Sequence, residues 1–171
     1  MRLPPLLASG VIVVMLGACL AEADEANETI NVTATDYAYN GVPDTVPVGT
    51  ELTLTNDSDD EIHEIVLVDL PGDELRQVRE VATGDRSRVM ELVSEHSTAV
   101  SVAPPGEDGD LIRGDLTLDD PGSYALLCVV PVGADPEEFM EALPDADGPP
   151  EVDGGEPHTA AGMYATLTVE P

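Results

Sequence analysis

Two histidines, one cysteine and one methionine have side chains of the kind that bind transition metals. His63 lies in the segment EIHEIVL, Cys128 closes the segment PGSYALLC, and His158 and Met163 stand five positions apart in HTAAGM near the end of the chain. A thiolate, two imidazoles and a thioether can share one ion. The same residue types are also ordinary parts of strands, cores and loops. The choice between these interpretations depends on the cysteines and on where the chain places all four residues.

The first of the two cysteines belongs to a predicted export signal. Arg2 precedes an apolar run from Leu6 to Leu16, which has the charge and length of a signal peptide and is shorter than the roughly 20 residues that a spanning helix needs. The run leads into LGAC, which resembles the bacterial lipobox, in which the cysteine is acylated and becomes the mature N-terminus. We therefore expect residues 1–18 to be a signal peptide and Cys19 to carry lipid. A plain secretory peptide cleaved nearby is the alternative.

Cys128 is then the only thiol left in an exported protein, so no internal disulfide can form. An unpaired thiol that persists in an oxidising compartment is either deeply buried or bound to a metal, and both interpretations stay open here. Residues 19–28 are acidic and short of large apolar side chains, which is typical of a flexible tether. We expect this tether to hold a single domain, residues 29–171, at the extracytoplasmic face of the cell membrane.

The charge of the chain excludes some partners. The formal net charge at pH 7 is −29, and the six basic residues are all arginines. Such an excess of acid argues against nucleic acid and against an anionic membrane surface as partners. It either steers a cationic partner or reflects an acidic proteome in a salty habitat, and charge alone does not decide between the two.

The pattern of apolar residues predicts an all-β domain. Apolar and polar residues alternate with a period of two, which is typical of half-buried strands. The segments with this period are 30–35, 52–55, 62–68, 99–103 and 116–118. Turn signals such as NG, NDS, PPG and DPG separate them, and regular short strands with such turns indicate a β-sandwich.

Two segments break the strand pattern and are expected to be short helices outside the sandwich. Residues 73–83 can form one helix, and DPEE at 135–138 starts a second helix with Phe139 and Leu143 one turn apart. Between Leu143 and His158 the chain is rich in Pro, Gly, Asp and Glu and has almost nothing to bury. This composition predicts a mobile loop.

Several motifs between residues 30 and 170 occur together in one order. They are DYAY at the end of the first strand, VG before the second, a histidine shortly after Asn56, then PGxYxxxC and HxxxxM. In this set and order the chain resembles the cupredoxins, the plastocyanin and azurin family of small blue-copper proteins. The resemblance implies a Greek-key β-sandwich in which His63, Cys128 and His158 are the equatorial ligands of one type 1 copper ion and Met163 is the weak axial ligand. It also implies a carrier of single electrons between redox partners and not an enzyme.

The chain departs from the family between the second and third of these ligands. Plastocyanin-like and azurin-like domains have only a few residues there, whereas here residues 129–157 form an insertion. A longer loop costs only about 0.6 kcal/mol per doubling of its length, so His158 can still reach the metal. The insertion is acidic and adjoins the face where family members usually meet their partners, so we expect a basic redox partner and a monomeric carrier. Its acidic residues are Asp135, Glu137, Glu138, Glu141, Asp145, Asp147, Glu151, Asp153 and Glu156.

Other functions fit the inventory of residues less well. A cysteine protease or acyl transferase needs its cysteine at a helix start or a strained turn beside a histidine, whereas Cys128 closes a strand. A multicopper enzyme needs more than the three histidines present, and a binuclear copper centre needs a second cysteine. A structural zinc site, a copper-storing or copper-delivering lipoprotein and a metal-free interaction module remain alternatives. His96 matches no ligand position and is expected at the surface.

Overall fold

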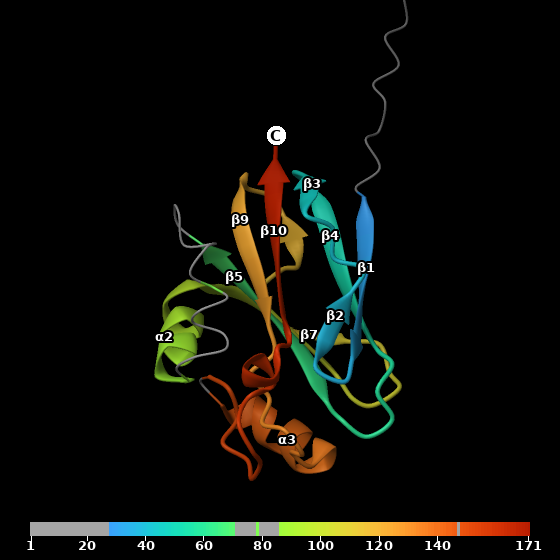
Figure 1. The fold of residues 1–171 in the computed structure, drawn as a ribbon, viewed down its shortest axis with the longest axis vertical. Helices are drawn as coiled ribbons and strands as arrows, with labels where there is room; N and C mark the ends of the chain where they lie inside the picture. The colour runs from blue at the N-terminus through green and yellow to red at the C-terminus, as the bar shows by residue number, and fades with distance from the viewer. Residues whose placement is uncertain (1–27, 71–77, 79–85, 147) are drawn as a thin grey trace, which may run out of the picture.

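The computed structural model describes residues 28–70, 78, 86–146 and 148–171, which form two packed β-sheets with helices outside them (Figure 1). The predicted signal peptide and Cys19 fall outside these residues, and so does the predicted helix over residues 73–83, apart from Val78. In the described part of the chain, no helix combines the length and the apolar character needed to cross a membrane.

The smaller sheet has the strand order β2-β1-β4-β8, in which β1 and β4 are parallel and the other pairs are antiparallel. Its strands are β1 (Thr29–Thr35), β2 (Ala38–Asn40), β4 (Thr50–Asn56) and β8 (Thr117–Leu118). The larger sheet has the order β3-β10-β9-β5-β6-β7, with one parallel pair, β3 and β10. Its strands are β3 (Thr45–Pro47), β5 (His63–Leu70), β6 (Ser97–Ala103), β7 (Asp110–Arg113), β9 (Gly122–Leu127) and β10 (Tyr164–Glu170).

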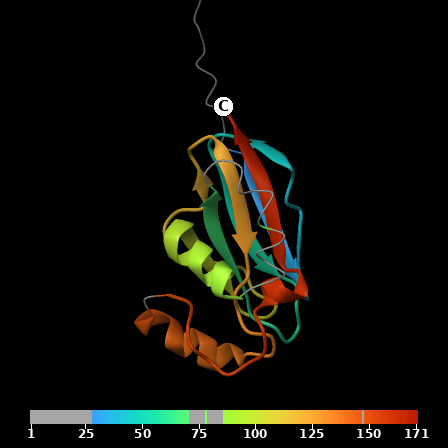
Figure 2. The same ribbon diagram turned by 60° about the vertical axis from the view of Figure 1, so that its left-hand side comes forward.

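The two sheets lie face to face (Figure 2), and the core between them is filled by apolar side chains from both. The alternation predicted from the sequence sets which side chains point inward, as Val32, Leu54 and Leu167 do from β1, β4 and β10. The predicted all-β sandwich is therefore confirmed. Each of the five predicted strand segments lies in or next to an observed strand.

The prediction that residues 62–68 form a half-buried strand is wrong, because β5 is buried on both faces. Ile65 points into the core between the sheets, whereas Val66 points outward into a second apolar cluster. Helix α2 (Arg86–His96) covers that outer face with Val89 and Val93. Helix α2 was not predicted from the sequence, although Leu92 and the two buried valines have the i, i+3, i+4 spacing of one helix face.

The second predicted helix is confirmed as α3 (Pro136–Ala142). The Asp135 carboxylate accepts hydrogen bonds from the backbone N–H groups of Glu137 and Glu138, which caps the helix. Phe139 projects from α3 into the core and is 1% exposed, so the insertion is anchored to the sandwich. The short 3₁₀ helix η2 (Leu143–Asp145) follows directly. The insertion thus carries more regular structure than its composition indicates.

Asn56, at the end of β4, fixes the loop that leads into β5. Its side-chain Nδ2 lies 2.9 Å from the carbonyl oxygen of Glu61, 3.0 Å from that of Ala103 and 3.1 Å from that of Pro104. Its Oδ1 accepts the backbone N–H of Ser58 at 2.9 Å. One buried amide therefore joins the loop before β5 to the end of β6.

We expect Asn56→Ala to lower the free energy of unfolding by about 1–3 kcal/mol, because it leaves several buried backbone groups without partners. Chemical denaturation of the metal-free protein measures this loss. Asn40→Ala is the matched control, since the exposed Asn40 side chain donates one hydrogen bond, to Thr35, at 3.2 Å. Equal effects of the two substitutions would contradict the role given to Asn56.

Candidate metal centre

The four candidate ligands lie at one end of the sandwich, opposite to the C-terminus (Figure 1). His63 is the first residue of β5, Cys128 directly follows β9, and Met163 directly precedes β10. His158 is the first residue of the 3₁₀ helix η3 (His158–Ala161). The prediction that the candidates lie at strand ends is confirmed for three of them, while His158 stands in a helical turn just before β10.

The long insertion brings His158 next to Cys128 because its two ends pair with each other. The backbone N–H of Val132 donates to the Glu156 carbonyl at 2.9 Å, and the N–H of His158 donates to the Val130 carbonyl at 2.9 Å. The residues between these two paired ends form a loop that leaves the sandwich and returns to it. The paired ends, and not the length of the loop, therefore set the position of His158.

A compact turn connects the histidine to the methionine. The N–H of Thr159 donates to the Cys128 carbonyl at 2.9 Å, and the N–H of Met163 donates to the His158 carbonyl at 3.0 Å. The turn ends at Gly162, whose φ of 107° is a conformation that L side chains rarely adopt. Cys128 N–H in turn reaches the Met163 carbonyl at 3.4 Å. These contacts hold the backbone of Cys128, His158 and Met163 together.

Three donor atoms converge inside this frame. His63 Nδ1 lies 3.1 Å from His158 Nδ1, and Cys128 Sγ lies 3.3 Å from the same nitrogen. The donor atoms of the three residues all lie within 4.8 Å of one another. All three residues are 0% exposed. This arrangement can hold one metal ion away from water.

The protonation states of the histidines suit metal binding. Burial, with the neighbouring His158, lowers the pKa of His63 from 6.5 to about 4, and burial also lowers the pKa of His158. Both imidazoles are therefore neutral at pH 7, which leaves a nitrogen lone pair on each for a metal.

Burial raises the pKa of the Cys128 thiol well above its ordinary value. Hydrogen bonds from the backbone N–H groups of Glu64 and Val130 act in the opposite direction and favour the thiolate. The thiol of the metal-free protein therefore stays protonated at pH 7, and a bound cation is needed to hold the thiolate. The sequence alone could not assign these two backbone donors.

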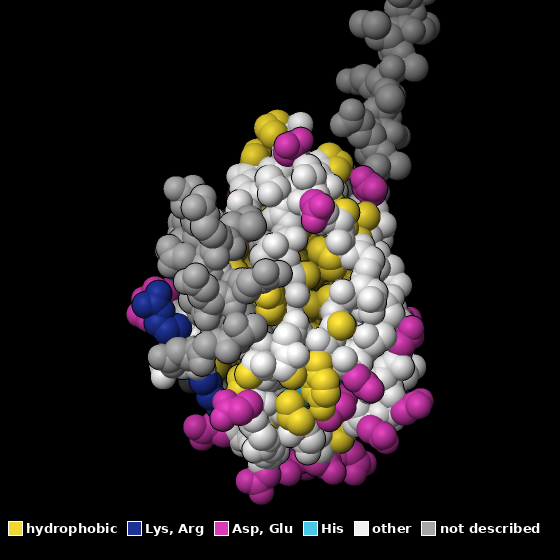
Figure 3. Space-filling model, in the orientation of Figure 1, with side chains coloured by type: hydrophobic (Ala, Val, Ile, Leu, Met, Phe, Trp, Pro, Cys, Tyr) yellow, Lys and Arg dark blue, Asp and Glu magenta, His cyan; other side chains and the backbone are white. Residues whose placement is uncertain are grey.

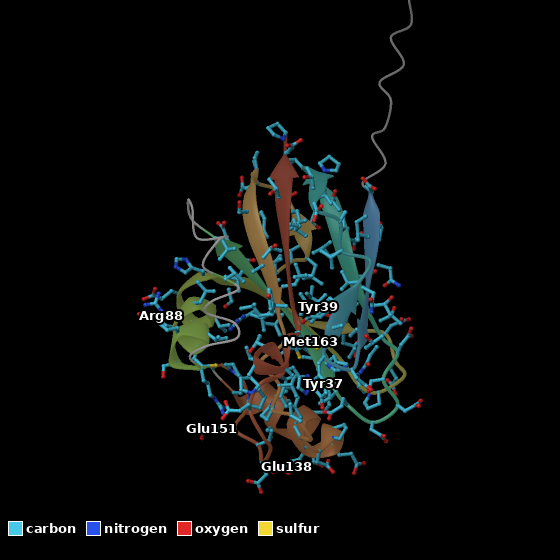
Figure 4. The ribbon with its side chains drawn as sticks, in the orientation of Figure 1. Tyr37, Tyr39, Arg88, Glu138, Glu151 and Met163 are labelled. Atoms are coloured by element: carbon cyan, nitrogen blue, oxygen red, sulfur yellow. The ribbon has the colours of Figure 1, made fainter. Side chains whose placement is uncertain are left out.

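The donor set fits copper better than structural zinc. One sulfur and two imidazole nitrogens match a type 1 copper site, with the Met163 thioether as the fourth candidate. Met163 is 0% exposed, and Figure 4 places it with Tyr37 and Tyr39 at this end of the sandwich. Within the described ranges, no carboxylate joins the three clustered donors, so the acidic fourth ligand that would favour zinc is missing there.

Two tyrosines of the motif DYAY and two glutamates flank the cluster, and the sequence analysis gave none of them a role. The Tyr37 ring meets the His158 ring edge to face, with centroids 5.1 Å apart, and its O–H donates to Glu61 at 3.1 Å. The Tyr39 O–H donates to the carbonyl of Glu64. The Glu64 side chain is buried and accepts the Val129 N–H at 3.1 Å, and burial raises the pKa of Glu64 to about 7.

His96 lies away from the cluster, at the end of α2. It is half-buried, and its Nε2 lies 3.8 Å from a carboxylate oxygen of Glu95. The structure therefore leaves it out of the site, as the sequence predicts.

The fold and the donor set together define a cupredoxin-like β-sandwich that has, among the described residues, one candidate type 1 copper site. No protein-family model matches the sequence, and no curated protein matches it either.

Three solved structures illustrate the similarity. A dithionite-reduced auracyanin from the photosynthetic bacterium Roseiflexus castenholzii has 24% sequence identity and a TM-score of 0.48, over 85% of this chain and 99% of that one. Auracyanin A, a "blue" copper protein from the green thermophilic photosynthetic bacterium Chloroflexus aurantiacus, has 17% identity and a TM-score of 0.44, over 83% and 98%. An azurin from Methylomonas sp. strain J has 13% identity and a TM-score of 0.44, over 85% and 100%. All three TM-scores lie below 0.5. The fold is therefore assigned from the strand pairing within this chain.

We expect His63 to destabilise the metal-free protein as the pH falls from 6.5 to about 4, whereas the buried Glu64, with its pKa raised to about 7, acts in the opposite direction. In this window the unfolded chain protonates the histidine at position 63 and the folded chain does not, so the proton favours unfolding. Denaturation at several pH values measures the slope. The His63→Gln variant lacks this histidine and keeps Glu64, so the stability of the wild type relative to this variant should fall over the window. His96→Gln is the control for loss of a histidine outside the cluster. Parallel slopes for wild type and His63→Gln would contradict the burial of a neutral imidazole.

Proposed function

We propose that this chain is an exported, monomeric type 1 copper protein that carries single electrons between redox partners. The observation that carries this proposal is the convergence of His63 Nδ1, His158 Nδ1 and Cys128 Sγ in one fully buried cluster. No other set of three His, Cys, Asp or Glu side chains in the described part of the chain is placed to hold a metal ion.

The residues around the cluster are arranged for repeated electron exchange. His63, Cys128 and His158 would hold a copper ion, which would supply one-electron redox chemistry. Strand pairing and the paired ends of the insertion hold the ligands from outside the cluster, so their positions do not depend on the metal. Burial keeps water away from the donors, and hydrogen bonds to Sγ stabilise the thiolate. A site that hardly moves when its charge changes favours fast electron transfer.

Complete burial favours an electron carrier over a copper-delivery protein. Delivery requires that ligands of a partner reach the ion, and all three donors here are 0% exposed. The same burial argues against an enzyme, because a substrate would also have to reach donors that are 0% exposed. The donor set also argues against a metal-free interaction module. Burying two imidazoles and a thiol together costs free energy unless these groups bind a ligand.

We expect the copper-loaded, oxidised protein to show an intense visible band from thiolate-to-copper charge transfer. Cys128→Ser should abolish the band because it removes the sulfur, and Met163→Leu should shift the band without abolishing it. A visible absorption spectrum after loading with one equivalent of copper provides the measurement. His96→Asn is the matched histidine control and should leave the spectrum unchanged. A colourless wild-type protein that binds stoichiometric copper would contradict the proposal.

The position of the site suits a protein tethered at its N-terminus. We propose that Cys19 carries a lipid anchor on the extracytoplasmic face of the membrane and that residues 19–28 are the tether. Strand β1 begins at the end of the sandwich that also holds the C-terminus, and the cluster lies at the other end (Figure 1). A membrane tether at β1 leaves the site end free to meet partners.

Acidic side chains gather at the site end of the molecule. Figure 3 shows Asp and Glu side chains around the base of the visible face, and Figure 4 places Glu138 and Glu151 there, on the insertion. Both are exposed, as is Glu141. We propose that this acidic end attracts a basic redox partner, since opposite charges accelerate encounter.

We expect electron exchange with small cationic metal complexes to be faster than with anionic ones, and to slow as salt is added. Stopped-flow measurements on the copper-loaded protein give both rates. The triple variant Glu138→Gln, Glu141→Gln, Glu151→Gln should reduce the rate with the cationic complex. The control triple variant, Asp119→Asn, Asp120→Asn, Glu170→Gln, removes the same charge at the opposite end and should have a smaller effect. If the two variants reduce the rate equally, the rate depends only on the net charge of the protein, and the proposal of a docking surface at the acidic end is contradicted.

A further inference from the structure

Glu61 contacts the outer edge of His158, away from the clustered donors. Its Oε2 lies 3.4 Å from His158 Nε2, while His158 Nδ1 faces His63 and Cys128. We propose that Glu61 is a positioning residue: its carboxylate holds the ring proton of His158 on Nε2 and so presents the Nδ1 lone pair to the metal. This inference rests on the proposed copper site and deepens it.

The Glu61 carboxylate is held in place by two donors from different segments. Its Oε1 accepts the O–H of Tyr37 at 3.1 Å, and the backbone N–H of Gly133 lies 3.3 Å from Oε1 and 3.2 Å from Oε2. The side chain is 17% exposed. Glu61 therefore joins the loop before β5, the turn after β1 and the start of the insertion, with its second oxygen directed at His158.

His158 Nε2 needs such a partner. The atom is buried and makes no hydrogen bond of good geometry within the described residues, so the 3.4 Å contact to Glu61 is the polar contact available to it. A neutral imidazole carries one proton, and a metal on Nδ1 requires that proton on Nε2. A carboxylate beside Nε2 favours this tautomer, and contacts of this kind often tighten when the site is occupied.

The two imidazoles of the cluster are therefore not equivalent. His63 Nε2 is also buried, and it has no partner among the described residues. Only His158 has a carboxylate at its outer nitrogen. A negative charge there raises the basicity of the ligand and favours the more positive, oxidised metal. Glu61 should thus lower the reduction potential of the site through His158.

Three variants separate the charge of Glu61 from its role as an acceptor. Glu61→Gln keeps an oxygen that accepts a hydrogen bond but removes the charge, and Glu61→Leu removes both. Asp60→Asn is the matched control, because it removes one charge from the neighbouring, exposed position. Unfolding free energies of all variants show whether each one is folded.

The first measurement uses the metal-free protein. Nitrogen NMR of the histidine rings reports which nitrogen carries the proton. In wild type and Asp60→Asn we expect the His158 proton on Nε2, in Glu61→Leu a mixture of both tautomers, and in Glu61→Gln an intermediate distribution. A wild-type distribution in folded Glu61→Leu would overturn the proposal.

The second measurement uses added copper. We expect Glu61→Leu to bind copper about 10–100-fold more weakly, the range typical of losing such a partner of a metal ligand. The reduction potential should rise in both Glu61 variants, by more than in Asp60→Asn. A potential in both Glu61 variants equal to that of Asp60→Asn would overturn the action through His158. A wild-type protein that binds no copper would refute the proposed function, whereas the tautomer measurement would still decide the role of Glu61.

Discussion

The function proposed for this structure depends on holding three polar side chains together where water cannot reach them. A thiol and two imidazoles lie within 4.8 Å in a region of zero exposure, and burial shifts the pKa of each toward its neutral form. Isolated from water, such groups cost free energy, because each loses hydrogen bonds that the protein only partly restores. The cluster therefore has to be held by the surrounding fold, and it gains its full complement of interactions only with a cation.

Three sets of contacts from the surrounding elements position the residues of the cluster. Asn56 fixes the loop in front of His63 through four hydrogen-bond contacts. The pairing of β9 with β10 places Cys128 beside Met163, since Leu127 pairs with Tyr164. The turn of η3 joins His158 to both of them. None of these contacts involves a metal, so the site is built by the same interactions that stabilise the sandwich.

The sequence predicted the fold class and the ligand candidates because both leave local signals. Alternation of apolar residues marks the strands, and the motifs PGxYxxxC and HxxxxM carry the resemblance that implied the ligand set. Helix α2 was not predicted, although Val89, Leu92 and Val93 stand at the i, i+3, i+4 spacing of a helix face and pack against β5. Consequently the sequence also missed that β5 is covered on its second face. Glu61 and Tyr37 could not be predicted as neighbours of His158, because their contacts join residues far apart in the chain.

Phe139 gives the insertion a second role, in the integrity of the domain. It is the only phenylalanine of the chain, it belongs to α3, and it fills part of the space between the sheets. Replacing residues 129–157 by a short loop of the plastocyanin kind would remove this side chain and leave a cavity, at a cost of about 3–5 kcal/mol if the change resembles Phe→Ala in a core. In this chain the ligand loop and the core therefore form one packing unit.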